Sequence, residues 1–206
     1  HDLELHRFGF SYIEPTVQQA AAFRDGSCVV IHQDLDATCA SLARFSKQDA
    51  KTFRDLYHQY AVKMRPLLVS LLYNAPLTID QLLDRLSGSE AKEFLSHAQH
   101  DLFSVVRKYF EDDRIRTLFT SYMHVVTTEN QPGSGIVFPA ILANVMSFGL
   151  PVGGAVNLPK ALERVIKSGD GIVLYDSDVK EILTSCNKAT GVRLANGDII
   201  ESDNFV

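Results

Sequence analysis

Two histidines have the spacing most suggestive of chemistry in this chain. His97 and His100 are three residues apart, and side chains at that spacing share one face of a helix, where they could ligate a metal ion. No carboxylate or third ligand joins them in a recognisable pattern. The sequence therefore favours a solvated helix face, and we expect no metal site.

The other reactive side chains lack the neighbours that catalysis requires. Cys39 and Cys186 have no adjacent base to form a thiolate, which favours buried thiols over nucleophiles. The acidic run at 111–113 is typical of a loop and helix start, because carboxylates are favoured at helix N-termini. The chain has no Gly-x-Ser-x-Gly elbow. We therefore assign no general acid, general base or nucleophile, and the catalytic residues stay unknown.

Glycines that could approach a cofactor occur late in the chain. Gly153 and Gly154 precede an apolar helix, where they either let the backbone pass near a ligand or form a turn that needs glycine. Gly169 and Gly171 follow that helix, whereas the G-x-G-x-x-G loop that cradles a pyrophosphate follows a strand. The chain therefore has no recognisable dinucleotide loop.

Three stretches of different patterning must position these residues. Residues 1–32 have short alternating apolar runs and a turn signal at 25–27, which predict strands and a hairpin. Residues 34–147 predict a region of helices. The remainder predicts a helix capped by Asn157, strands at 172–174, 179–183 and 191–194, a turn at 187–190, an Asn-Gly hairpin at 196–197, and a last strand from 199.

Local signals divide the helical region. Ser46 with Asp49, and Thr78 with Gln81, have the spacing of a capping box. Pro66 should interrupt the helix that follows Ser46, because proline lacks the N–H that an internal helical position donates. Apolar residues at helical spacing then predict helices over 91–109, 115–126 and 137–148.

The composition is that of an ordinary globular protein. Of the 206 residues, 46% are hydrophobic and 22% are charged. A formal charge of −5 without a long basic run argues against a nucleic-acid partner. The three cysteines are far apart, which argues against a disulfide framework and fits a reducing compartment. We therefore expect a cytoplasmic location.

The two ends of the sequence favour a piece of a longer chain. The first residue is His1, and the segment 199–206 has the pattern of a strand with no turn after it. A complete domain seldom ends within a strand, because an unpaired edge is left without its neighbours. A natural chain with a processed terminus is the alternative.

The C-terminal part of the chain resembles a known family. Its segments are Pro-Val-Gly-Gly-Ala-Val-Asn-Leu-Pro-Lys-Ala-Leu (151–162), Gly-Asp-Gly-Ile (169–172), Asp-Val-Lys-Glu-Ile-Leu (178–183) and Thr-Gly-Val-Arg-Leu-Ala-Asn-Gly-Asp-Ile-Ile (190–200). This order resembles the phytoene desaturase and carotenoid isomerase-like FAD-dependent oxidoreductases of the amine oxidase superfamily. The resemblance is tight over these segments and looser over the helical middle.

The resemblance implies an α/β fold, which is α+β within this chain. Residues 1–148 correspond to a substrate-binding domain, strands then helices, and residues 149–206 to part of a Rossmann-like FAD-binding domain. The family's N-terminal dinucleotide-binding motif and C-terminal Gly-Asp segment are missing. FAD is therefore expected in the intact parent and not in this piece, which is expected to be inactive by itself.

The resemblance also suggests cofactor-binding residues. Val179 matches a family valine whose backbone contacts the adenine, and an ordinary core valine is the alternative. Gly153 and Gly154 are the second candidates, because the family's Gly-Gly pair lies near the flavin and substrate.

The implied activity is desaturation or isomerisation of an apolar small molecule. The cofactor performs the redox chemistry, while the protein orients the substrate and excludes water. With such a substrate, peripheral association of the protein with a membrane is possible. A family member that has lost redox activity and acts as a binding or regulatory protein is the alternative function. Several helix aromatics then belong either to the core or to the wall of a substrate tunnel, with core as the default: Tyr57, Tyr60, Tyr73, Phe119 and Tyr122.

Overall fold

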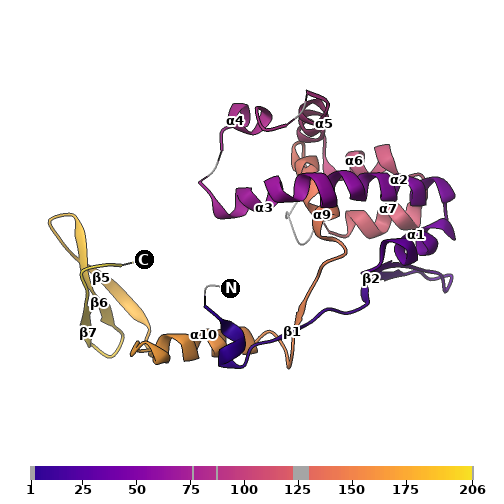
Figure 1. The fold of residues 1–206 in the computed structure, drawn as a ribbon. Coiled ribbons are helices and arrows are strands. Elements are labelled where there is room, and N and C mark those ends of the chain that lie inside the picture. Colours follow the sequence, from indigo (N-terminus) through magenta and orange to yellow (C-terminus); the bar gives the residue numbers. More distant parts are fainter. Residues whose placement is uncertain (1–2, 76, 87, 123–129, 206) are drawn as a thin grey trace. The chain divides into compact units, whose positions relative to one another are not determined.

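The chain folds as two units. The computed structural model describes residues 3–75, 77–86, 88–122 and 130–205, without the side chains at 70–72, 79 and 91. Residues 13–150 form one unit, and residues 1–12 form the other together with 151–206. The chain passes between the units in the short paired strands β1 (Tyr12–Ile13) and β4 (Leu150–Pro151) (Figure 1). The mixture of helices and strands agrees with the predicted α+β class, and residues 1–12 group with the C-terminal unit rather than with the helices.

The larger unit begins with a hairpin and continues as helices. The antiparallel strands β2 (Val17–Ala22) and β3 (Cys28–His32) flank a turn at 25–27, which confirms the predicted hairpin. None of the helices in the described part of the chain is both long and apolar enough to cross a membrane. The helical segments are α1 (Leu35–Ala43), α2 (Lys47–Tyr57), the π-helix η2 (His58–Met64), α3 (Arg65–Tyr73), α4 (Ile79–Leu83), α5 (Gly88–Ala98), α6 (Leu102–Tyr109), α7 (Asp113–Thr120), the 3-10 helix η3 (Ser134–Val137) and α9 (Phe138–Asn144).

A continuous apolar core joins the hairpin to the helices. Strand β3 packs on α1 and α7, and its alternate side chains Val29 and Ile31 are fully buried. Deeper in the unit, the rings of Phe110 and Phe119 stack with centroids 4.8 Å apart. The prediction that the first strands pack against the helices is therefore confirmed for the hairpin.

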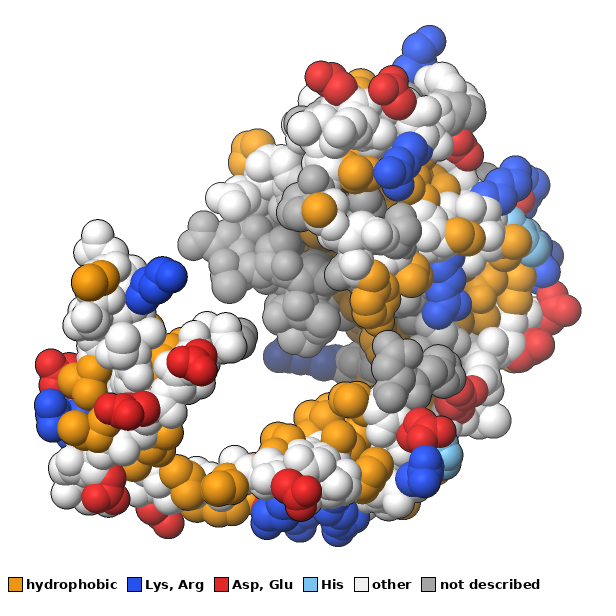
Figure 2. Space-filling view, turned by 60° about the vertical axis from the view of Figure 1, so that its left-hand side comes forward, with side chains coloured by type: hydrophobic (Ala, Val, Ile, Leu, Met, Phe, Trp, Pro, Cys, Tyr) orange, Lys and Arg blue, Asp and Glu red, His pale blue; other side chains and the backbone are white. Residues whose placement is uncertain are grey.

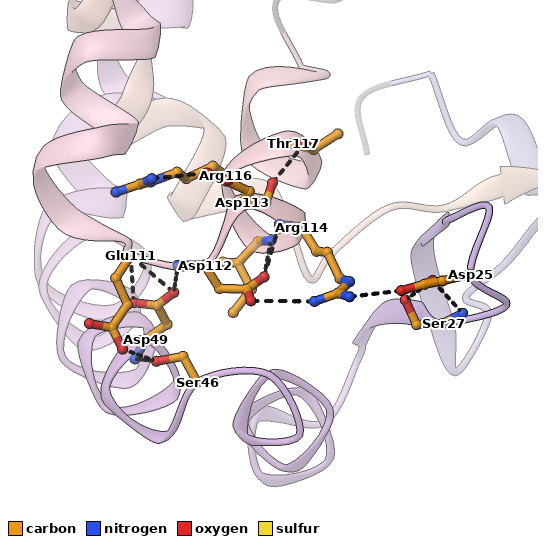
Figure 3. A network of polar contacts seen from close by, with 11 residues as sticks. Asp25, Ser27, Ser46, Asp49, Glu111, Asp112, Asp113, Arg114, Arg116 and Thr117 are labelled. Carbon is orange, nitrogen blue, oxygen red and sulfur yellow. Dashed lines mark hydrogen bonds and ion pairs between the residues drawn. The ribbon is translucent and has the colours of Figure 1, made fainter.

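A buried carboxylate ties α2 to the start of α7. Asp49 is only 1% exposed and accepts the N–H groups of Glu111 (2.9 and 3.1 Å) and Asp112 (2.9 Å) (Figure 3). The predicted capping box at Ser46 is therefore only half formed: the Ser46 hydroxyl accepts from the Asp49 N–H, but the Asp49 carboxylate binds a distant loop. A buried charge needs such hydrogen bonds to be tolerated.

Prolines and caps set the breaks between helices. The helix that follows Ser46 is interrupted by the π-helix η2 from His58 to Met64, and Pro66 is the second residue of the α-helix that resumes after it. The predicted capping box of Thr78 and Gln81 is present at the start of α4. The single helix expected over 91–109 is wrong, because Asp101 caps a new helix, α6, after α5 has ended. Residues 123–126 of the next expected helix lie outside the described residues.

The smaller unit consists of helices and a sheet. They are the 3-10 helix η1 (Leu5–Phe8), α10 (Asn157–Ser168), and an antiparallel sheet of β5 (Val179–Ser185), β6 (Lys188–Leu194) and β7 (Ile199–Glu201), in that order. The Arg164 guanidinium of α10 donates to the Phe8 carbonyl at 2.7 Å and so holds η1.

Four expectations for this unit are corrected. Residues 5–8 are helical rather than extended, and the strand expected over 172–174 finds no partner strand among the described residues. Asn157 is the first residue of α10 rather than its N-cap, which is Val156, and its side chain donates to the Val152 carbonyl at 2.6 Å. The hairpin turn lies at 186–187, where both residues are left-handed, and β6 starts earlier than predicted.

Candidate functional site

The Gly153-Gly154 pair forms a tight turn before α10. Both residues have left-handed backbones, with φ of 73° and 98°, which glycine adopts without the steric cost that a side chain adds. A Cβ on Gly153 would lie 2.6 Å from the Asn157 amide nitrogen, whereas nothing lies within 4 Å of a Cβ on Gly154. Turn geometry therefore accounts for both glycines, and Gly154 also leaves open space beside the backbone.

Val179 is the first residue of β5, at an edge of its sheet. Among the described residues, β5 pairs with β6 on one side only, and Val179 lies opposite Leu194. The Val179 side chain is 55% exposed, so it is not a core valine of the described unit. An edge strand can present its free main-chain groups to a ligand, as it can to another strand.

The two cofactor candidates do not lie together. Helix α10 separates the glycine turn at its start from the loop that leads to Val179 at its end (Figure 1). Its 12 residues give a helix of about 18 Å. The two candidates are therefore separated along the chain by this helix and the ten residues that follow it.

Sequence reasoning did not identify a half-buried polar cluster in the larger unit. Glu93 of α5 accepts the Gln59 side-chain N–H from η2 and the Tyr109 hydroxyl from α6, the latter at 2.6 Å. His97 Nε2 lies 3.0 Å from the same Tyr109 hydroxyl. The Tyr60 hydroxyl is buried beside this group without a hydrogen bond of normal geometry. Helical spacing could have placed Glu93 near His97 on α5, but no local signal identifies Gln59 or Tyr109 as partners.

The predicted role of the histidine pair is wrong for His97. His97 is 1% exposed rather than solvated, and burial lowers its pKa from 6.5 to about 4. His100 lies beyond the end of α5 and is exposed. Within the described part of the chain, no cluster of histidine, cysteine or carboxylate side chains could hold a metal ion.

The cysteines and aromatics divide between core and surface. Cys39 is buried as expected, and burial raises its pKa, but Cys186 is exposed in the β5–β6 turn. Tyr60, Phe119 and Tyr122 are buried in the core, and Tyr57 packs against it. Tyr73 is 84% exposed.

Comparisons with known proteins give a consistent group of relatives. No family model matches the chain. The chain is 25% identical over 209 residues to one of the subunits of limonene dehydrogenase from Castellaniella defragrans, covering 98% of this chain and 38% of that protein. It is 28% identical over 187 residues to the zeta-carotene-forming phytoene desaturase of Myxococcus xanthus, covering 88% and 35%. It is also 27% identical over 105 residues to a chloroplastic prolycopene isomerase of Daucus carota, covering 50% and 17%.

The chain therefore spans well under half the length of the curated relatives that it matches. These relatives confirm the resemblance that the C-terminal segments indicated. By sequence, this chain is a relative of the phytoene desaturase and carotenoid isomerase-like oxidoreductases.

Proposed function

We propose that the whole protein is an FAD-dependent oxidoreductase that desaturates or isomerises an apolar small molecule. In this proposal residues 13–150 belong to the substrate-binding domain and residues 151–206 to the FAD-binding domain. The observation that carries the proposal is the match to a limonene dehydrogenase subunit and a phytoene desaturase over 98% and 88% of the chain. Both names describe removal of hydrogen from hydrocarbons.

A hydrocarbon substrate limits the interactions by which the protein can bind it. It offers no polar group to hydrogen-bond, so apolar contact and exclusion of water must provide its binding. When bound, FAD supplies the hydride acceptor, while the protein orients substrate and cofactor. We assign no acid, base or nucleophile in this chain.

The smaller unit has features that fit a cofactor. The exposed edge of β5 at Val179 can offer main-chain N–H and C=O groups to an adenine. The open space beside Gly154 can admit a flat ligand close to the backbone. These features support Val179, Gly153 and Gly154 as the residues that would hold FAD.

The test uses the full-length protein and two variants of it. Purified protein should show flavin absorption bands. Val179→Ala should weaken FAD binding by less than about tenfold, because a main-chain contact survives loss of the side chain. Val179→Arg should weaken binding far more, because the long side chain displaces the adenine.

Thr184→Arg is the matched control, because Thr184 is an exposed polar residue of the same strand. It should leave the FAD dissociation constant unchanged. Folded Val179→Arg protein that binds FAD as tightly as wild type would show that the adenine contact is wrong. A full-length protein that neither carries nor binds flavin would instead support a binding or regulatory role.

A further inference from the structure

The hydrogen bonds around Tyr109 fix the proton position on His97. The Tyr109 hydroxyl has one proton, and it donates this proton to the Glu93 carboxylate at 2.6 Å. Its contact with His97 Nε2 at 3.0 Å must then be one in which Nε2–H donates and the hydroxyl oxygen accepts. His97 therefore has its proton on Nε2. Its Nδ1 is a buried lone pair with no hydrogen-bond partner in the described structure.

This arrangement fastens α5 on two sides. The Glu93 carboxylate of α5 accepts from Gln59 on η2 with one oxygen and from Tyr109 on α6 with the other. His97, one helical turn further along α5, donates to the same Tyr109 hydroxyl. The imidazole also lies against the Phe138 ring of α9, with centroids 5.9 Å apart. Both ends of this turn of α5 are therefore held by side chains that can take up a proton.

The carboxylate is also accessible to protons from the surface. Glu93 and Gln59 line a surface hollow of about 360 Å³, which brings water to the outer side of the cluster. The helices η3 and α9, which pack on α5, α6 and η2, carry no ionisable side chains. Among the described residues, the other charged or titratable groups around the cluster include the buried Tyr60, whose ring centroid lies 6.2 Å from that of His97. Further out are Asp55, His58, Lys63, Glu90, His100 and Lys108.

We propose that Glu93, Tyr109 and His97 form an acid-sensitive latch that fastens α5 to α6 and η2, and that a second proton on His97 releases it. That proton must go to Nδ1, which has no hydrogen-bond acceptor among the described residues, so the new charge is buried among aromatic rings. The nearby Glu93 carboxylate offsets only part of this cost, because burial has the larger effect on His97. Release frees α5 from the aromatic core while the hairpin and α7 stay packed.

The direction of the pH effect follows from the two groups. Burial lowers the pKa of His97 from 6.5 to about 4, so its contribution is complete above 6.5 and is lost as the pH falls below that value. Burial raises the pKa of Glu93, but hydrogen bonds from Tyr109 and Gln59 outweigh it, and the net pKa is lowered. The contribution of Glu93 is therefore also lost in acid, and both groups favour release at low pH.

The test is hydrogen exchange of the full chain at pH 7 and pH 5. Protection factors, which remove the intrinsic pH dependence, should fall about twentyfold in α5, since the His97 pKa is about 4 in the closed state against 6.5 when released. Protection in β3 and α7 should stay nearly constant. Equal protection of α5 at both pH values would overturn the proposal.

Two variants isolate the histidine. His97→Phe keeps an aromatic ring but cannot titrate, so it should abolish most of the fall in α5 protection between pH 7 and pH 5. His100→Gln is the control, because it removes an exposed histidine close by and should leave the fall intact. A full response in folded His97→Phe protein would refute the latch.

A measurement on the wild-type protein stands independently of any variant. The ¹⁵N shifts of His97 should show a neutral ring protonated on Nε2 at pH 5.5. A ring protonated on Nδ1, or a titration near the ordinary value of 6.5, would contradict the proposal even if His97→Phe does not fold.

Discussion

The two units of this chain differ sharply in how many of their apolar side chains are buried. The larger unit buries a continuous core from Val29 on the hairpin to Met146 beyond α9. In the described part of the smaller unit, the buried hydrophobic side chains are Phe10, Ala161 and Leu194. Figure 2 shows orange hydrophobic side chains at the surface of this part of the chain. The exposed hydrophobic residues of α10, the sheet and the segments beside them include Val156, Ile166, Ile172, Leu174, Val179, Ile182, Ile199 and Ile200.

The difference shows that regular secondary structure does not require a filled core. Ile182, Val192 and Ile200 lie opposite one another across the three strands, so they form an apolar row of the kind that normally packs against a second layer. The hydrogen bonds of the sheet are formed although this row is not covered within its unit. The stability of the two units should therefore respond differently to the loss of apolar groups.

The largest expected effect is loss of a core ring. Phe119→Ala removes a fully buried side chain that stacks on Phe110, and should lower the free energy of unfolding by about 3–5 kcal/mol because a cavity remains. Urea denaturation of the chain measures it. Ile182→Ala, at a residue that is 62% exposed, should change the stability of the smaller unit by less than about 0.5 kcal/mol. Equal losses would remove the contrast between the units.

The second expected effect concerns the buried carboxylate of the larger unit. Asp49→Asn replaces an oxygen that accepts N–H groups from 111–112 by an amide that itself donates. The free energy of unfolding should fall by about 2–3 kcal/mol, because buried N–H groups lose a charged acceptor. Asp55→Asn breaks an ion pair with Lys51 in which the aspartate side chain is 64% exposed and should cost less than about 0.5 kcal/mol. A loss for Asp49→Asn as small as this control would show that the carboxylate is dispensable.

The third expected effect concerns the left-handed backbone of the glycine turn in the smaller unit. Gly153→Ala should destabilise the turn before α10 by about 1–2 kcal/mol, because alanine is strained at a left-handed φ and its Cβ would meet the Asn157 side chain. Gly154→Ala should cost less, since its Cβ enters open space. Amide protection in α10 measures both. Gly169→Ala, at the end of the same helix, is the control, because its φ of −103° is open to alanine and its Cβ would make only an ordinary contact of 3.7 Å with the Ile166 carbonyl oxygen. An identical result for all three would exclude backbone strain.

The smallest effect is expected at Val179. Because the side chain is 55% exposed, Val179→Ala should change amide protection in β5 and β6 by less than about 0.5 kcal/mol in this chain. A loss of more than about 1.5 kcal/mol, as for a cavity in a core, would show that Val179 is a structural residue and would favour that interpretation over a cofactor contact.

The sequence predicted those features whose partners lie nearby in the chain. Thr78 and Gln81 cap a helix within one turn, and the turn at 25–27 joins adjacent strands, so both follow from local spacing. Pro66 also acts locally, through the N–H that it lacks. The C-terminal segments predicted the relatives because their order is specific.

The remaining features depend on distant partners. The Asp49 carboxylate binds main-chain groups 62 and 63 residues away. Its spacing from Ser46 therefore predicted the hydrogen bond of its own N–H but not the partners of its carboxylate. His97 has a polar side chain but is buried by rings from α6 and α9, which no pattern within α5 could reveal. The segment 172–174 has apolar side chains but no partner strand among the described residues.

The π-helix at 58–64 has a consequence for how this unit could change in evolution. A π-turn accommodates an additional residue within a helix, and here the residues of that turn include Gln59 and Tyr60, which face the polar cluster. Deletion of one residue between His58 and Met64 would restore a regular α-helix and leave α2 and α3 nearly in register, but it would change which side chains this turn presents. Relatives that differ by a single-residue gap at this point should therefore also have a different polar cluster.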